Sequence, residues 1–526
     1  MIGRLLATTC VLAVSASSAM ADYTLHILHI NDMHSRIEPI NAFDSTCNAE
    51  QNAAGECFGG VARLATIVAQ LRADLAGENV IFLDAGDQYQ GSLMYTTYKG
   101  DVEIEFLNLI ARDAMAVGNH EFDDGPAGLA KLLDGATFPV ISGNIDVSSE
   151  PVLAGKVNNH VILEVGGQRI GIISALATDT VDTASPGRNV IFTPEAESLM
   201  ADVAALEAEG VDKIIALNHV GIAADLALAA AVPGVDAIVG GHSHTLMSNT
   251  VEGAMAYPTM VGAVPVVQAY AYSKYLGHLT LTFDDAGNVT AATGDTILLD
   301  ASVAEDEAVL ARVAELAGPI EELKTRVVAE ASADIDGSRE VCRAMECPMG
   351  NLVAEAMLAR VRDQGITIAI QNGGGLRASI PAGEVTMGGV LAVLPFQNTL
   401  STFQVTGAAV VEALENGVSK VEEGAGRFPQ VAGLTFAFDP AAPAGARVSN
   451  VMVAAEGGWA PIDPTATYGV VSNNYVRGGG DGFAMFVAAQ NAYDFGPDLA
   501  DVTAEYMAAN APYTPFTDGR ITVIGQ

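Results

Sequence analysis

Short β-rich runs alternate with helical stretches along most of this 526-residue chain, and this alternation restricts the possible folds more than any other feature of the sequence. In the first half, the β-rich runs cover residues 23–30, 79–83, 114–117, 169–175, 213–217 and 237–239. Strands that alternate with amphipathic helices are typical of an α/β fold. We therefore predict a βαβ sandwich, with helices on both faces of a mixed sheet, in the N-terminal half.

The pattern changes after Asp300. Residues 304–331 are rich in Ala, Glu and Leu, and their periodicity favours a helix between two domains. A second α/β unit follows, and it contains none of the nine histidines, which all lie before residue 279. We predict a first domain at 22–303, a linker helix and hinge at 304–336, and a second domain at 337–526.

The N-terminus has the features of an export signal. Arg4 precedes an apolar run at residues 5–14, and Ala19-Met20-Ala21 forms an A-x-A cleavage site before Asp22. The run is too short to span a bilayer as an anchor, and residues 520–526 contain no lipid-anchor tail. We expect residues 1–21 to be removed and the mature protein to be periplasmic, or secreted, without a membrane anchor.

The composition narrows the class of protein further. Half of the residues are apolar, and 63 acidic against 25 basic residues give a net charge of −38. The chain is thus neither disordered nor a polytopic membrane protein, and its surface repels nucleic acid polymers. A small anionic substrate would need local positive charge to enter, so clustered arginines are informative. Composition leaves both a monomer and a homodimer open.

Four cysteines remain after the predicted cleavage, and they form two local pairs: Cys47 with Cys57 and Cys342 with Cys347. An even number of closely spaced cysteines in an exported protein favours two short-loop disulfides. The alternative is a four-thiol zinc site, which would have to join pairs that lie almost three hundred residues apart.

Five polar clusters stand where an apolar strand ends. They are Asn31-Asp32-Met33-His34, Gly86-Asp87, Gly118-Asn119-His120-Glu121-Phe122-Asp123, Asn218-His219 and Gly240-Gly241-His242-Ser243-His244. Ligands of open α/β sheets bind beyond the carboxyl ends of the strands, so these clusters can converge in one crevice. Their carboxylates, imidazoles and amide suit Zn, Mn or Fe, and seven candidate ligands fit two ions that share a carboxylate.

The ordered set D-x-H, G-D, G-N-H-E-x-D, N-H and G-G-H-S-H resembles the calcineurin-like binuclear metallophosphoesterases. Motifs of the second unit resemble the C-terminal domain of the 5′-nucleotidases: Asn372-Gly373-Gly374-Gly375-Leu376-Arg377, Leu394-Pro395-Phe396-Gln397-Asn398 and Gly479-Gly480-Asp481-Gly482-Phe483. The resemblance covers nearly the whole mature chain in the same order. It includes both cysteine pairs, which resemble disulfides of animal ecto-5′-nucleotidases.

The resemblance implies two divalent ions, drawn from Zn, Mn, Co and Mg. It assigns Asp32, His34 and His244 to the first metal, Asn119, His219 and His242 to the second, and Asp87 to the bridge between them. It also implies that His120, paired with Asp123, stabilises the transition state or protonates the leaving group. A carboxylate that accepts one ring N–H of such a histidine fixes its tautomer and favours the imidazolium.

In the second domain, the resemblance implies that Arg343, Asn372 and Arg377 contact the phosphate and ribose. Arginine suits this task because its planar fork binds phosphate oxygens in pairs. Phe396 and Tyr475 would stack on the two faces of the base, with Tyr475 where the family pattern has Phe. Asp481 would contact the ribose hydroxyls, and Asn398 a base edge.

Together these features predict a phosphoric monoester hydrolase that converts nucleoside 5′-monophosphates to nucleoside and phosphate. Two alternatives stay open: a UDP-sugar or NAD pyrophosphatase or 2′,3′-cyclic-nucleotide phosphodiesterase on the same site, and an inactive nucleotide-binding protein. The resemblance also implies a large rotation of the second domain, for which residues 333–338 are a plausible hinge.

Some histidines, and one glutamate inside a motif, receive no assigned role. We expect His26, His29, His160 and His278 to be ordinary strand or surface histidines. Glu121 lies between two assigned residues, and we expect it only to help shape the loop.

Overall fold

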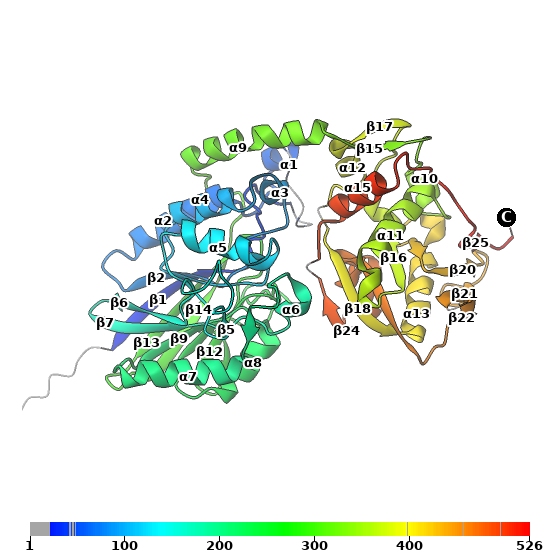
Figure 1. The fold of residues 1–526 in the computed structure, drawn as a ribbon. Helices are drawn as coiled ribbons and strands as arrows, with labels where there is room; N and C mark the ends of the chain where they lie inside the picture. Colours follow the sequence, from blue (N-terminus) through cyan, green and yellow to red (C-terminus); the bar gives the residue numbers. More distant parts are fainter. Residues whose placement is uncertain are drawn as a thin grey trace, which may run out of the picture.

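The computed structural model describes residues 22–525 apart from 42–43, 45–46, 48, 397, 456 and 495. The predicted signal peptide at 1–21 lies outside the described residues, as does residue 397 of the motif at 394–398. Two lobes lie side by side, with the N-terminal lobe in blue to green and the C-terminal lobe in yellow to red (Figure 1).

The first lobe contains two six-stranded mixed sheets. The first sheet has the order β14-β13-β1-β2-β3-β4, and its strands are β1 (Tyr23–Ile30), β2 (Val80–Asp84), β3 (Ala114–Ala116), β4 (Val140–Ile141), β13 (Tyr275–Phe283) and β14 (Val289–Leu298). The second has the order β11-β12-β10-β9-β7-β6, with β6 (His160–Val165), β7 (Gln168–Ile173), β9 (Lys213–Leu217), β10 (Ala237–Val239), β11 (Thr259–Val261) and β12 (Val264–Val267). The short strands β5 (Ile145–Asp146) and β8 (Ile191–Phe192) form a separate pair.

Eight α-helices of the described part belong to this lobe. They are α1 (Ala49–Ala54), α2 (Val61–Asp74), α3 (Leu93–Tyr98), α4 (Asp101–Leu109), α5 (Pro126–Gly135), α6 (Thr180–Thr183), α7 (Glu195–Ala208) and α8 (Ile222–Ala231). Helix α9 (Glu307–Thr325) follows the lobe and runs along its top towards the second lobe (Figure 1).

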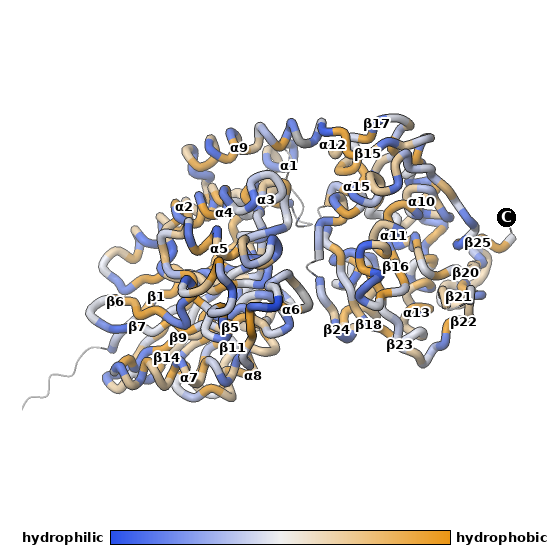
Figure 2. The backbone as a smooth tube through the Cα atoms, viewed as in Figure 1, coloured by the Kyte–Doolittle hydropathy of each residue, from blue (hydrophilic) through white to orange (hydrophobic). Residues whose placement is uncertain are grey.

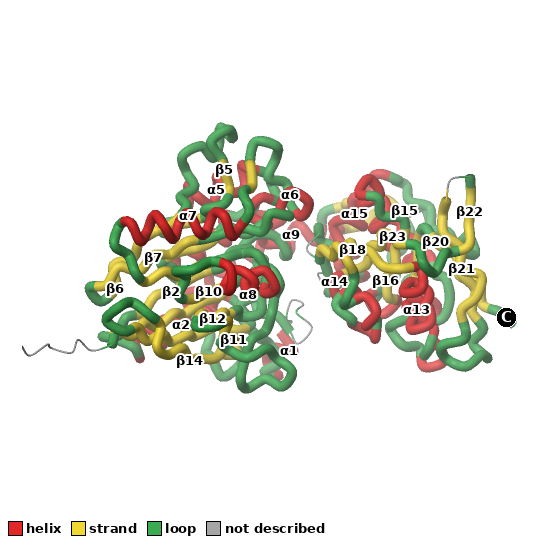
Figure 3. Tube along the Cα trace, turned by 90° about the horizontal axis from the view of Figure 1, so that it is seen from below, coloured by secondary structure: helices red, strands yellow, loops and turns green. Residues whose placement is uncertain are grey.

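The two sheets pack face to face, and helices cover their outer faces. Strand β1 shows why: Leu25 and Ile27 pack into the core between the sheets, whereas Leu28 and Ile30 pack under α2, α4 and α9. A strand buried on both faces reads as a nearly continuous apolar run, which is how β1 appears in the sequence. Helices α7 and α8 cover the outer face of the second sheet (Figure 3). The α/β prediction is therefore confirmed, with two facing sheets where we predicted one.

The second lobe is built on a five-stranded sheet of order β19-β16-β23-β18-β24. Its strands are β16 (Ile368–Asn372), β18 (Leu400–Thr406), β19 (Pro429–Ala432), β23 (Thr467–Asn473) and β24 (Gln490–Tyr493). A four-stranded sheet consists of β20 (Leu434–Phe438), β21 (Val448–Ala455), β22 (Gly458–Pro461) and β25 (Ile521–Val523), and a further pair consists of β15 (Val327–Ala331) and β17 (Gly383–Thr386).

Helices cover both faces of the five-stranded sheet. Those of the second lobe are α10 (Arg339–Cys342), α11 (Pro348–Val361), α12 (Met387–Val393), α13 (Gly407–Val418), α14 (Asn474–Arg477) and α15 (Leu499–Ala509). The apolar sides of α11, α12 and α15 pack on one face, and α13 together with β20 packs on the other. Apolar segments thus run through the interior of both lobes (Figure 2).

Helix α9 is amphipathic, with hydrophilic and hydrophobic residues alternating along its length (Figure 2). Leu316 and Ile320 pack against the first lobe, and the Tyr98 hydroxyl donates to the backbone oxygen of Leu316 at 2.8 Å. The next element, β15, already pairs with β17 of the second lobe. Ile335, inside the predicted linker and hinge at 304–336, exchanges backbone hydrogen bonds with Ile380. The backbone oxygen of Arg326 also accepts the N–H of Met387 in the second lobe at 2.9 Å, so these contacts favour a hinge earlier in that range, between Ile320 and Arg326.

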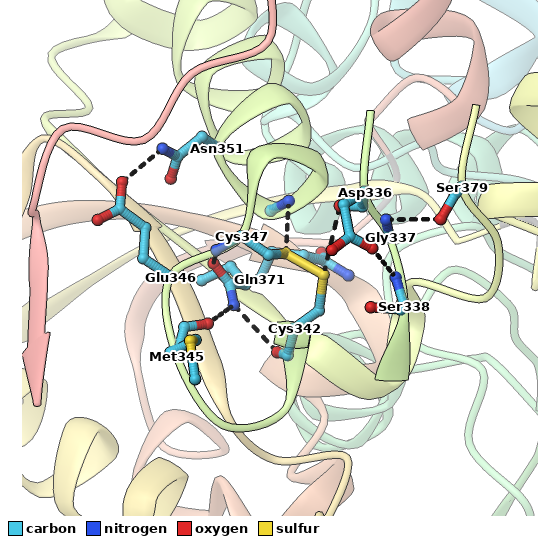
Figure 4. The surroundings of a disulfide bond; sticks show 12 residues. Asp336, Gly337, Ser338, Cys342, Met345, Glu346, Cys347, Asn351, Gln371 and Ser379 are labelled. Atoms are coloured by element: carbon cyan, nitrogen blue, oxygen red, sulfur yellow. Dashed lines mark hydrogen bonds between the residues drawn. A yellow bond between two sulfur atoms is a disulfide. The ribbon is translucent and has the colours of Figure 1, made fainter. Parts of the chain in front are cut away.

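Both cysteine pairs form disulfides, Cys47–Cys57 and Cys342–Cys347, as predicted. Cys342 and Cys347 are fully buried, and Figure 4 shows their bond beside the segment Asp336–Ser338. Gln430 donates from its amide to the backbone oxygens of Cys342 and Met345, at 3.0 and 2.8 Å. The second disulfide therefore fixes the short loop that carries Arg343.

Candidate metal centre and substrate cleft

The seven candidate metal ligands lie at the carboxyl ends of parallel strands in both sheets of the first lobe. Asp32 and His34 follow β1, Asp87 follows β2 and Asn119 follows β3, while His219 follows β9 and His242 and His244 follow β10. Because the two sheets face each other, their strand ends meet at one edge. The structure brings all seven together there.

The donor atoms converge in two groups. In the first, Nε2 of His34 lies 2.9 Å from Nε2 of His244, and the latter lies 3.3 Å from Oδ1 of Asp32. In the second, Oδ1 of Asn119 lies 2.9 Å from Nδ1 of His242 and 3.2 Å from Nε2 of His219.

Asp87 lies between the groups. Its Oδ2 is 3.0 Å from Nε2 of His219 and 3.8 Å from Nε2 of His34. Donors that are each about 2.0–2.2 Å from one ion lie roughly 3–4 Å from one another, so these separations suit metal binding. The donor set of imidazoles, carboxylates and one amide fits two divalent ions that share Asp87.

The electrostatics of the site also favour bound cations. Burial opposes protonation of His219, yet Asp87 and Asp32 outweigh it and raise its pKa to about 10. Burial lowers the pKa of His34 to about 4 and that of His242 to about 3, which keeps a lone pair on these rings available to a metal. His219 donates from Nδ1 to the backbone oxygen of Ala85 at 2.6 Å, and this bond directs its Nε2 to the site.

The loops that carry the ligands are locally strained. Asp32, His34, Asp87, His242 and His244 all have positive φ, between 49° and 75°. Such conformations cost roughly 1–3 kcal/mol per residue and cluster at functional sites. Gly118 shows how closely the loops approach: a Cβ there would lie 2.2 Å from Oδ1 of Asp87.

Glu121 has a clearer function than sequence reasoning indicated. Its fully buried carboxylate accepts the backbone N–H groups of Asp87 at 3.1 Å, Gln88 at 2.8 Å and Gly118 at 2.7 Å. It therefore joins the loop after β2 to the loop after β3. The sequence signal was its position inside the G-N-H-E-F-D motif.

His120 begins the short helix His120–Phe122, directly after Asn119. Its Nδ1 lies 2.6 Å from Oδ2 of Asp123, so the predicted pair is formed. Burial opposes protonation of His120, but Asp123 and Asp87 outweigh it and raise its pKa to about 9. A donor atom of His120 also lies close enough to those of His34 and Asp87 for the three to bind one ion. The position of His120 is therefore compatible both with a catalytic role and with metal binding.

The predicted substrate residues of the second lobe all line one cleft of about 980 Å³. They are Arg343, Asn372, Arg377, Phe396, Asn398, Tyr475 and Asp481. Asn372 donates to Oδ2 of Asp481 at 2.7 Å, and the Tyr475 hydroxyl lies 3.1 Å from Oδ1 of the same carboxylate. The Arg377 guanidinium lies 5.5 Å from the centroid of the Phe396 ring.

The opposite wall of this cleft comes from the first lobe and includes His244 of the candidate metal centre. Arg36, Tyr270 and Tyr272 line the same wall, and sequence reasoning did not select them. Arg36 could have been found from its position two residues after His34. The two tyrosines belong to no local motif that marks them.

The comparisons with known proteins agree with this geometry. Residues 25–246 match the family described as calcineurin-like phosphoesterase, and residues 327–488 match the family described as 5′-nucleotidase, C-terminal domain. The chain belongs to the 5′-nucleotidase family. It is 37% identical to a 5′-nucleotidase of Homo sapiens and 36% identical to one of Diplobatis ommata, each over 96% of this chain and at least 90% of the relative.

Solved structures show the same two-lobed family fold. A 5′-nucleotidase precursor from Thermus thermophilus is 41% identical, with a TM-score of 0.61 over 96% of this chain and all of that one. The NAD nucleotidase of Haemophilus influenzae is 25% identical, with a TM-score of 0.76 over 96% of this chain and 99% of that one. Calcineurin-like phosphoesterases use divalent metal ions, which the donor set above can hold. Within the described part of the chain, no helix has the length and apolar character needed to cross a membrane.

Proposed function

We propose that this protein is an exported, metal-dependent 5′-nucleotidase of the periplasm that hydrolyses nucleoside 5′-monophosphates to nucleoside and phosphate. One observation supports this most strongly: the cleft that holds the predicted nucleotide contacts is walled on its other side by His244 of the candidate metal centre. A nucleotide bound by the second lobe would thus direct its phosphate towards the first.

Asp32, His34 and His244 would hold one divalent ion and Asn119, His219 and His242 the other, with Asp87 shared. Two such ions, when bound, supply a nucleophilic water near neutral pH and charge stabilisation for the phosphoryl group. The two ions are drawn from Zn, Mn, Co and Mg.

The chain's own residues perform the remaining steps. Phe396 and Tyr475 would stack on the base, while Asp481 contacts the ribose and Asn398 a base edge. Arg343, Asn372 and Arg377 would hold the ribose and phosphate. His120, kept protonated by Asp123, would stabilise the negative charge that develops on the leaving oxygen or give it a proton.

A wider substrate range is the second candidate. The fold relative with a TM-score of 0.76 is an NAD nucleotidase, and a cleft of about 980 Å³ leaves room beyond one nucleoside monophosphate. An inactive nucleotide-binding protein is the remaining alternative, although all seven predicted ligands are present and close together.

A substrate panel tests the proposal. The metal-free protein, reloaded with one defined divalent ion at a time, is given AMP, NAD, UDP-glucose and 2′,3′-cyclic AMP, and the disappearance of each substrate is measured together with the released phosphate, nucleoside and nucleoside monophosphate. We expect AMP to have the highest kcat/KM. A higher value for NAD or UDP-glucose would favour the pyrophosphatase alternative, and no turnover with any metal would favour the inactive binding protein.

A further inference from the structure

Arg36 is a buried cation beside the candidate metal centre. It stands two residues after His34 and is only 6% exposed. Its Nη1 donates to the backbone oxygen of Gly91, in the loop that also carries Asp87, and its backbone N–H donates to the backbone oxygen of Met33 at 3.0 Å. The backbone of Arg36 is therefore held in the loop that follows β1, while its guanidinium is bonded to the loop that follows β2.

Two cavities meet at this side chain. Arg36 lines the 980 Å³ cleft together with the predicted nucleotide contacts of the second lobe. It also lines a narrow crevice with His34 and His120 of the first lobe and Asn474 of the second. Arg36 thus lies between the place predicted for the nucleotide and the place predicted for the chemistry.

Tyr272 fixes the guanidinium relative to the metal ligands. The Cζ atom of Arg36 lies 5.2 Å from the centroid of the Tyr272 ring. The same ring centroid lies 5.8 Å from that of His34 and 5.3 Å from that of His244. Tyr272 has a positive φ of 60°, and its backbone N–H donates to the backbone oxygen of Asp32 at 2.8 Å. The local backbone therefore holds Tyr272 between the cation and the ligands.

The positive charge of Arg36 matters for the binding of an anionic substrate. A phosphate monoester dianion approaches a chain with a net charge of −38, so its binding depends on local positive charge. Among the described residues that line the cleft, Arg343 and Arg377 supply this charge from the second lobe, and Arg36 supplies it from the first. An arginine held by packing loses little freedom when it binds phosphate oxygens.

We propose that Arg36 binds the phosphoryl group of the substrate from the metal-bearing lobe, facing Arg343 and Arg377 across the cleft. The ligand class is a phosphate monoester dianion, and inorganic phosphate, as product, shares the contact. This inference rests on the proposed function, because it assigns a residue to the phosphate of that substrate.

The test compares Arg36→Gln with Arg72→Gln in metal-loaded protein. Arg72 bears the same charge, but it lies away from the cleft and donates to the backbone oxygen of Ala111 at 2.7 Å. The measurements are KM and kcat for AMP, the inhibition constant of inorganic phosphate, and the thermal shifts that phosphate and adenosine each produce.

We expect Arg36→Gln to raise both the KM for AMP and the phosphate inhibition constant by about tenfold or more, as the loss of a charged hydrogen bond predicts. The shift with adenosine should stay unchanged, and Arg72→Gln should behave like the wild type. Unchanged phosphate inhibition in Arg36→Gln would overturn the inference while leaving the nucleotidase proposal intact. Equal weakening of phosphate and adenosine would also overturn it, because that pattern indicates a purely structural part for Arg36.

Arg36→Lys covers the case in which Arg36→Gln does not fold. Lysine keeps the charge but lacks the planar fork, so phosphate inhibition should weaken several-fold with adenosine binding intact. Wild-type phosphate inhibition in the folded Arg36→Lys protein would count against the inference. If the wild type fails to hydrolyse AMP but its thermal shift with phosphate still depends on Arg36, the proposed function fails and this contact stands.

Discussion

The carboxylate of Glu121 accepts the backbone N–H of Gln88 at 2.8 Å, although the two residues lie on loops that follow different strands. The same side chain accepts N–H groups from Asp87 and Gly118. Burial raises the pKa of Glu121 to about 7, and the nearby charge of Asp87 acts in the same direction. One carboxylate thus determines how the bridging ligand lies relative to Asn119.

We expect Glu121→Gln to weaken metal binding without removing a ligand. In the wild type, the backbone N–H groups of both loops share the two carboxylate oxygens of Glu121. The glutamine amide has only one oxygen, so some of these N–H groups lose their acceptor. Partners of this kind typically change metal affinity by about 10–100-fold. Metal titration of the metal-free variant measures the effect, with Glu164→Gln, an exposed carboxylate on β6, as the control. Wild-type metal affinity in Glu121→Gln would show that the loops hold their positions without it.

Asp87 should be the most sensitive of the ligand positions. Its Oδ2 lies near imidazoles of both donor groups, His219 at 3.0 Å and His34 at 3.8 Å. Asp87→Ala should therefore cost more turnover at saturating metal than either His34→Ala or His219→Ala, each of which affects one group. Near-normal turnover of Asp87→Ala would show that Asp87 is not the ligand shared by the two ions.

Sequence reasoning predicted which residues come together in the candidate site because these residues follow a pattern that is visible in the local sequence. Polar clusters at the ends of apolar strands predict one crevice, and β1, β9 and β10 begin and end close to the predicted runs. The separation into two sheets was not predictable from the same pattern. A strand such as β1 is buried on both faces in either arrangement, so its composition does not reveal what covers it.

Residues that act through tertiary contacts were harder to find. Tyr272 carries no motif, and its place beside His34 depends on a backbone turn with positive φ. The predicted hinge at residues 333–338 likewise follows only from the position of the helix at 304–331 between the two units. The hydrogen bonds of Ile335 with Ile380 join segments that are distant in the sequence, and no local sequence pattern predicts such pairing.

The variant His120→Asn tests whether His120 is a catalytic residue or a metal ligand. Loss of a positioned acid typically lowers turnover by about 10²–10⁴-fold, and we expect a decrease in this range with the metal content unchanged. Asp123→Asn, which removes the partner 2.6 Å from Nδ1, should give a smaller decrease. Metal analysis of the purified variants decides the matter, and loss of one ion from His120→Asn would make His120 a ligand instead.

Glu103 should make stability depend on pH. This carboxyl is fully buried on α4, and burial raises its pKa to about 7, against the weaker opposing effect of a hydrogen bond from Ser35. Between the ordinary carboxyl pKa near 4.5 and about 7, the folded state keeps a proton that the unfolded state has lost. Stability from this group therefore falls as pH rises through that window.

Glu103→Gln removes this dependence, because the amide keeps the acceptor but does not ionise. Relative to the wild type, the variant should gain stability from pH 5 to pH 8, by up to about 3 kcal/mol. Urea unfolding at both pH values measures the difference, with the exposed Glu423→Gln as control. An equal difference at pH 5 and pH 8 would show that Glu103 ionises normally in the folded protein.

The last prediction concerns movement between the lobes. The candidate metals lie in the first lobe and the predicted base stack in the second, so nucleoside release requires the cleft to open. Helix α9 packs on the first lobe as far as Ile320, and the backbone from Arg326 onward is hydrogen-bonded within the second, so any bending falls between these two residues. Ser185 and Ala508 are exposed residues of different lobes that line a second cleft of about 860 Å³. Each of the four cysteines in the described part of the chain is in a disulfide, so cysteines introduced at these two positions react selectively with a short bismaleimide.

Bridging the two introduced cysteines should suppress turnover of AMP, whereas the two single-cysteine variants treated with the same reagent should remain active. A spacer that periodate cleaves restores freedom without reducing the native disulfides, and turnover should return. Full turnover while mass spectrometry shows the bridge intact would mean that the lobes need not separate. The prediction that they move apart during turnover should then be abandoned.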